Sequence, residues 1–165
     1  MNVNFSKQLI KGKIAETIFE EMFRVSEEFT IIPLGYEHTT PILAQYQHHA
    51  QIKEVLDNIR SAPDFALISQ DKSQVYLVEV KYRKSLHDKN ILEIAEETKE
   101  RWNPCFIFVA TNEKFYFSSC SQIITNKGKI DELGERWVKE DVQKQYLLLL
   151  QEFIQQDSSQ EDNKG

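Results

Sequence analysis

The stretch Ala62–Lys84, APDFALISQDKSQVYLVEVKYRK, is the strongest indication of the fold in this sequence. Two apolar runs flank a polar segment, Ser69 to Gln74, and this pattern is typical of a β-hairpin. We predict strands over Pro63–Ile68 and Val75–Tyr82. The second strand contains two charged residues at alternate positions, although Glu and Lys are depleted in strands, so their presence there calls for a reason.

The hairpin predicts that three charged side chains share one face of the sheet. Strand alternation places Glu79 and Lys81 on the same face. A turn through Asp71 and Lys72 puts Asp64 opposite Glu79, whereas a turn through residues 71–74 puts it opposite Lys81. Both registers leave all three side chains on one face, with their roots roughly 4.5 to 8 Å apart.

The chemistry of this triad indicates a metal site. Two carboxylates so close together repel each other, and a hard divalent cation resolves the repulsion. Magnesium takes oxygen ligands, usually one or two carboxylates with waters and substrate phosphate, and Asp64 and Glu79 would supply them, with the carbonyl of Val80 as a further candidate. Manganese is the alternative ion. Lys81 could orient or deprotonate an attacking water and stabilise charge on a phosphate, which predicts phosphodiester hydrolysis.

Three short motifs together resemble a known superfamily. The pair Pro63-Asp64, the tripeptide E-V-K that ends at Lys81, and the upstream segment K-G-K-I-A-E that ends at Glu16 resemble the PD-(D/E)XK nucleases. The string V-E-V-K-Y-R is similar to resolvase-like branches of that superfamily. The resemblance covers about residues 11–110 in the order helix, strand, hairpin, helix, strand.

The resemblance implies a fold, an activity and a set of residues. The implied fold is α/β and restriction-endonuclease-like, with a three-layer core in which helices flank a mixed central sheet. The implied activity is magnesium-dependent endonuclease cleavage of DNA. Asp64 and Glu79 would be metal ligands, Lys81 a catalytic residue, and Glu16 the glutamate that many members carry on the first helix, with Glu20 as its alternative.

Two other interpretations remain open at this point. One is a module of the same fold that has lost activity and serves in binding or assembly, which the acidity of the chain favours. The other is an unrelated α/β interaction protein whose E-x-K forms an ordinary solvated ion pair.

Charge and length constrain the partners. The 165 residues carry a formal charge of −6, which argues against a protein that coats nucleic acid nonspecifically. Residues 1–92 hold 11 Lys and Arg against 12 Asp and Glu, and residues 93–165 hold 9 against 14, so a polyanion is expected to dock on the first part. The candidate phosphate contacts there are Lys11, Lys13, Arg83 and Lys84, with scattered surface charge as the alternative. We expect DNA as the partner, and a homodimer is compatible with double-strand cleavage.

Composition favours a cytoplasmic protein with one domain over residues 1–156 and a polar, disordered tail over 157–165. Cys105 and Cys120 form no C-x-x-C pair, and no apolar run reaches the roughly 20 residues of a membrane span. We interpret His38, His48 and His49 as solvated side chains rather than metal ligands.

Hydrophobic spacing predicts the remaining elements. They are a helix over 4–25, with a later start after Gly12 as the alternative, and a strand over 29–36, in which Pro33 and Gly35 indicate an edge position, a bulge or an early end. A loop and a helix ending near Arg60, a helix over 91–102, a buried central strand over 106–110 and a short strand over 115–117 follow. The last elements are a turn at 126–128 and a helix over 131–155, whose start Gly134 could delay.

Overall fold

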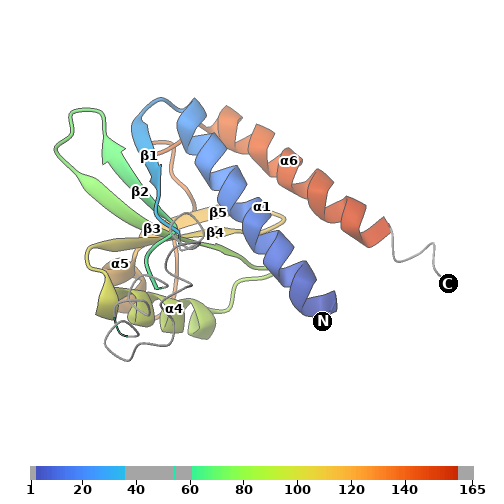
Figure 1. The fold of residues 1–165 in the computed structure, drawn as a ribbon, viewed down its shortest axis with the longest axis horizontal. Helices are drawn as coiled ribbons and strands as arrows, with labels where there is room; N and C mark the ends of the chain where they lie inside the picture. The colour runs from blue at the N-terminus through green and yellow to red at the C-terminus, as the bar shows by residue number, and fades with distance from the viewer. Residues whose placement is uncertain (1–2, 36–53, 55–60, 160–165) are drawn as a thin grey trace.

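A five-stranded mixed sheet forms the centre of the computed structural model, which describes residues 3–35, 54 and 61–159. The strands lie in the order β1-β2-β3-β4-β5, and β3 and β4 are the parallel neighbours among otherwise antiparallel pairs (Figure 1). Their bounds are β1 Phe29–Pro33, β2 Phe65–Ser69, β3 Val75–Tyr82, β4 Cys105–Ala110 and β5 Phe115–Ser119.

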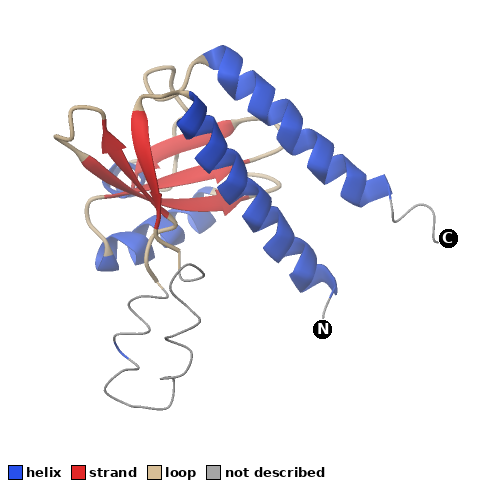
Figure 2. Ribbon diagram, turned by 45° about the horizontal axis from the view of Figure 1, so that its top comes forward, coloured by secondary structure: helices blue, strands red, loops and turns tan. Residues whose placement is uncertain are grey.

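Helices cover both faces of this sheet. The long helices α1, Val3–Val25, and α6, Glu140–Ser159, run side by side over one face (Figure 2). The helices α4, Asp88–Arg101, and α5, Cys120–Thr125, pack together against the other. The predicted α/β architecture, a mixed sheet flanked by helices, is confirmed at this level.

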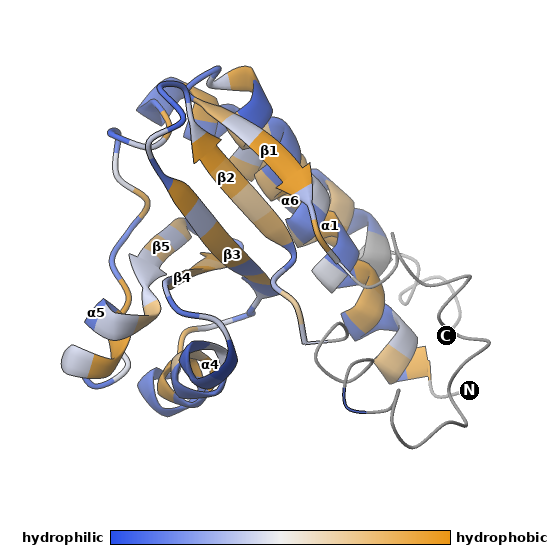
Figure 3. Cartoon of the chain, turned by 60° about the vertical axis from the view of Figure 1, so that its left-hand side comes forward, coloured by the Kyte–Doolittle hydropathy of each residue, from blue (hydrophilic) through white to orange (hydrophobic). Residues whose placement is uncertain are grey.

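The core beneath α1 is aromatic. The helix buries Ala15, Ile18, Phe19, Met22 and Phe23, whose three- and four-residue spacing is that of one helical face. The ring of Phe19 lies 5.2 Å from that of Phe65 and 4.9 Å from that of Phe108, so the helix is held against β2 and β4. The strands β1 and β2 consist mainly of hydrophobic residues (Figure 3).

The hairpin adopts the first of the two predicted registers. Phe65 lies opposite Val78 and Ile68 opposite Val75. Asp64 directly precedes the last pair, in the register that would place it opposite Glu79. Asp71 fixes the turn, because its Oδ1 accepts hydrogen bonds from the Ser69 hydroxyl at 2.7 Å and from the Ser73 backbone N–H at 2.9 Å.

The strand predicted over 106–110 is buried as expected, and it lies between β3 and β5, while β3 is the central strand of the sheet. β4 sends Phe108 and Ala110 into the cluster beneath α1, and Ile107 and Val109 into the cluster beneath α4. Cys105, at the start of this strand, and Cys120, at the start of α5, are both buried free thiols.

The helix predicted over 131–155, with a start that Gly134 could delay, begins later, at Glu140. The segment from Asp131 to Leu133 lies along β5, and a turn at Gly134 follows it. Phe117 N–H donates to the Asp131 carbonyl and Leu133 N–H to the Phe115 carbonyl, each at 2.9 Å. At its other end α6 reaches Ser159, three residues into the predicted tail.

The six-residue helix α5 was not predicted. Ser119 accepts a hydrogen bond from the Gln122 N–H at its start. At its end Lys127 N–H donates to Ile124 and Gly128 N–H to Ile123, the paired bonds of a Schellman cap. The predicted turn at 126–128 is therefore this cap.

The first strand lies at the edge of the sheet and ends early, two of the outcomes that Pro33 and Gly35 indicated. β1 ends at Pro33, which has no N–H for further pairing. The predicted helix ending near Arg60, and His38, His48 and His49, lie outside the described residues. Within the described residues, no helix has the length and apolarity needed to cross a membrane.

Candidate functional site

The site forms where β2 and β3 part. Their pairing ends at Phe65 and Val78, yet β3 continues to Tyr82. Over this extension β3 pairs with β4 on its other side, with Glu79 opposite Ile107. The side of β3 that faces β2 is therefore left to other partners.

Asp64, just before β2, bonds to a backbone N–H of β3 that does not pair with β2. Its Oδ2 accepts a hydrogen bond from the Val80 N–H at 2.7 Å. Its own carbonyl accepts one from the Leu34 N–H at 2.9 Å. The residue is thus held between the end of β1 and the extension of β3, and its carboxylate cannot swing freely.

Glu79 and Lys81 lie side by side on β3. They alternate with Val78 and Val80, which are buried in the cluster beneath α1, so both side chains leave the sheet on the opposite face. The Lys81 ammonium forms an ion pair with Glu79 Oε1. The side chain of Lys81 is 32% exposed and that of Glu79 is 18% exposed, so water and small ions can reach the pair.

The pKa of Asp64 depends on the charges of the other three predicted residues. Burial is the main cause that raises the pKa of Asp64 to about 7, followed by the negative charge of Glu79 and then that of Glu16. The Val80 N–H and the positive charge of Lys81 act in the opposite direction. Glu16 on α1, together with Glu79 and Lys81 on β3, therefore influences the ionisation of Asp64.

Glu16, rather than its alternative Glu20, is the helical carboxylate whose charge acts on Asp64. Glu16 Oε2 lies 3.0 Å from the Lys13 ammonium. Glu20 pairs instead with Arg24, at 2.6 Å, near the end of the helix.

The donor set fits a cation that uses few protein ligands. No group of three or more His, Cys, Asp or Glu side chains within the described residues is arranged to hold a metal ion. Asp64 and Glu79 instead offer a pair of carboxylate oxygens, which matches magnesium, since this ion keeps several waters. A bound cation would also offset the repulsion that raises the pKa of Asp64. The Val80 carbonyl remains a predicted ligand, and the contact observed at Val80 is made by its N–H.

The four predicted phosphate contacts differ in their surroundings. Lys11 lies over the ring of Tyr82, 5.7 Å from its centroid. Lys13 pairs with Glu16. Arg83 is half-buried, while Lys84, the next residue, is exposed.

Arg83 joins β3 to α4. Its Nε donates to Asn90 Oδ1 and its Nη1 to the Tyr82 carbonyl, both at 2.8 Å. Burial lowers the pKa of its guanidinium. Sequence reasoning missed this role, because a basic residue that follows a strand gives no sign of a partner on the next helix.

No protein-family model matches the chain, and no curated protein is significantly similar to it.

Proposed function

We propose that this protein is a magnesium-dependent nuclease that hydrolyses DNA phosphodiester bonds. The observation that supports this most is the placement of the Asp64 carboxylate, held by the Val80 N–H at 2.7 Å next to the β3 segment that carries the Glu79–Lys81 ion pair. The charges of Glu79 and Glu16 help to raise the pKa of Asp64, and a carboxylate with a strongly shifted pKa is found at functional sites more often than elsewhere.

The order of elements supports a restriction-endonuclease-like fold for this proposal. Along the chain, α1 is followed by β1, the β2–β3 hairpin, α4 and β4. This is the order helix, strand, hairpin, helix, strand that accompanies the motifs in the resemblance. Asp64 directly precedes β2, the first strand of the hairpin, and Glu79 lies on β3, the second, which is close to the placement that the resemblance implies.

Each residue has a separate task in the proposed reaction. Asp64 and Glu79 hold the ion, and Glu16 adds negative charge beside them. When bound, the ion polarises the phosphate and lowers the pKa of a coordinated water. Lys81, which pairs with Glu79, would direct its ammonium to the attacking water or to the charge that develops on the phosphate.

The experiment is a nicking assay on supercoiled plasmid with magnesium or manganese. We expect ion-dependent cleavage by the unchanged protein and a loss of at least about a hundredfold in Lys81→Ala, the typical effect of removing a general acid, base or charge stabiliser. Lys144→Ala is the matched control, because Lys144 also pairs with a glutamate, at 2.9 Å, but on α6. It should cleave as the unchanged protein does.

Two results would count against the proposal. Equal cleavage by the unchanged protein and Lys81→Ala would indicate a contaminating nuclease. No cleavage of supercoiled, linear or branched DNA with either ion would favour a binding or assembly module of the same fold.

A further inference from the structure

The exposed apolar side chains gather on the two long helices. Among the described residues, ten large hydrophobic side chains are exposed, and eight of them belong to α1 or α6. Such a concentration on one layer of a protein marks an interaction surface more often than chance exposure does. The eight are Val3, Phe5, Leu9, Ile10, Val25, Leu148, Leu149 and Phe153.

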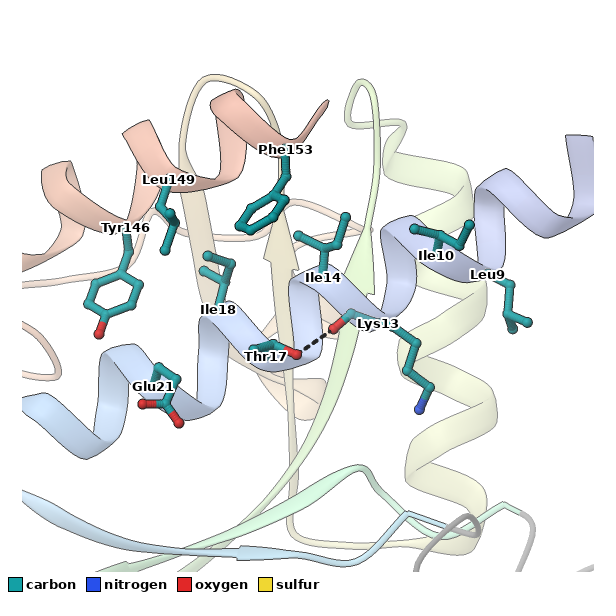
Figure 4. A pocket seen from close by; sticks show the side chains of 10 residues that line it. All are labelled: Leu9, Ile10, Lys13, Ile14, Thr17, Ile18, Glu21, Tyr146, Leu149 and Phe153. Carbon is teal, nitrogen blue, oxygen red and sulfur yellow. Dashed lines mark hydrogen bonds between the residues drawn. The ribbon is translucent and has the colours of Figure 1, made fainter. Parts of the chain in front are cut away.

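A groove of about 370 Å³ runs between the two helices within this layer. Its walls are mainly apolar, with Ile10 and Ile14 from α1 facing Leu149 and Phe153 from α6 (Figure 4). Two charged residues of α1, Lys13 and Glu21, also line it.

The charges of α1 are divided along its length. Lys7, Lys11 and Lys13 lie in its first half, the acidic residues Glu16, Glu20 and Glu21 follow, and Arg24 in the last turn leaves the second half with a net negative charge. A helix dipole favours acidic groups toward the N-terminus and basic groups toward the C-terminus, so the stability of the isolated helix does not account for this order. Two copies of α1 laid antiparallel would match basic half to acidic half, whereas two parallel copies would oppose like charges.

We propose that the groove between α1 and α6 docks onto the same surface of a second copy of this chain, with the two α1 helices antiparallel around Thr17. Lys13 and Glu21 each lie four residues, or about 6 Å, from Thr17 along the helix. The two-fold arrangement therefore brings Lys13 of one copy to the level of Glu20 and Glu21 of the other.

The ion pairs within one chain are compatible with further ion pairs to a second copy. Arg24 donates to both Glu20 and Glu21, at 2.6 and 2.8 Å, so a single positive charge serves two carboxylates. Lys13 pairs with Glu16 inside its own chain, and Glu20 and Glu21 of the second copy join that network. The contact is self-complementary and closes as a two-fold dimer, and it does not depend on the proposed hydrolysis.

Sedimentation equilibrium of the full chain tests the apolar part of this proposal. We expect a dimer whose dissociation constant rises about tenfold or more in Phe153→Asp, since the aromatic ring is removed and a charge enters the interface. Val75→Asp is the matched control, because Val75 and Phe153 are both 51% exposed and Val75 lies on β3. A chain that stays monomeric at all concentrations, or a dimer equally affected by both variants, overturns the proposal.

A mixing experiment tests the antiparallel order and does not depend on one variant. Lys13→Glu alone places acidic groups against acidic groups, and Glu21→Lys alone places basic groups against basic groups, so each variant should dimerise more weakly than the unchanged chain. Mixed together, the two should form a heterodimer tighter than either homodimer. Circular dichroism confirms that both variants are folded, and failure of the folded variants to associate on mixing overturns the antiparallel arrangement.

Discussion

The Asp64 carboxylate accepts a hydrogen bond from the backbone N–H of Val80 at 2.7 Å. The contact lies just beyond the last paired residues of β2 and β3. A side chain of the candidate site therefore bonds to the backbone of β3 where the pairing of the two strands ends. The same bond holds Asp64 next to Glu79, whose charge opposes its ionisation.

The raised pKa of Asp64 predicts a specific pH dependence of stability. Burial and the nearby carboxylates raise it from 3.8 to about 7, so between these values the folded state binds a proton that the unfolded state releases. The stabilisation is fully present below about pH 4 and is lost as pH rises through about 7. In Asp64→Asn, whose amide oxygen still accepts the bond from Val80, we expect this loss, on the order of a few kcal/mol, to be absent. Urea unfolding across this range measures it.

Asp71 provides a control of opposite sign. Hydrogen bonds from the Ser69 and Ser73 hydroxyls lower the pKa of Asp71 from 3.8 to about 2. Its contribution is therefore present above the unfolded value and is lost as pH falls through about 2. If the difference between the unchanged protein and Asp64→Asn followed the same direction as that for Asp71→Asn, the account of Asp64 would be wrong.

The glycines predict two opposite effects of alanine. Gly128 has a φ of +96°, and a Cβ there would lie 2.0 Å from the backbone carbonyl oxygen of Asp88, at the start of α4. Gly128→Ala should lower the free energy of unfolding by about 2 kcal/mol or more, since backbone must move. Gly12 lies inside α1 with nothing within 4 Å of an added Cβ, so Gly12→Ala should raise that free energy by up to about 1 kcal/mol. Thermal or urea unfolding compares them.

We expect substitution of Arg83 to lower stability and substitution of its neighbour Lys84 to weaken DNA binding. Arg83→Ala removes hydrogen bonds to Asn90 and to the Tyr82 carbonyl, and should lower the free energy of unfolding by about 1 to 3 kcal/mol. Lys84→Ala should leave stability unchanged and reduce the salt dependence of DNA binding by about one phosphate contact. Fluorescence anisotropy at several salt concentrations gives that slope. Unchanged stability in Arg83→Ala would contradict the structural role.

Local patterns made much of the fold predictable. The spacing of Ile18, Phe19, Met22 and Phe23 identified α1, and the polar turn at Asp71 identified the hairpin, because both signals arise from neighbouring residues. Alternation on β3 placed Glu79 and Lys81 together without any knowledge of distant contacts.

Distant contacts explain what the sequence could not predict. Leu133 and Trp137 have helical spacing, yet Leu133 bonds to β5, a turn at Gly134 follows, and the Trp137 ring stacks on Phe29 at 5.7 Å. Likewise, nothing local to Val80 indicates that β3 extends past its pairing with β2. The use of the Val80 N–H by Asp64 depends on where two segments separate in space.

Calorimetric titration with manganese tests the central claim most directly, because it measures the proposed ion site without requiring the correct DNA. We predict one ion bound per chain in the unchanged protein at about pH 8, where Asp64 is ionised. Binding should be lost in Asp64→Asn and in Glu79→Gln, and it should persist in Lys81→Ala. An affinity for manganese that is unchanged in folded Asp64→Asn, or that is absent from the unchanged protein, would contradict the assignment.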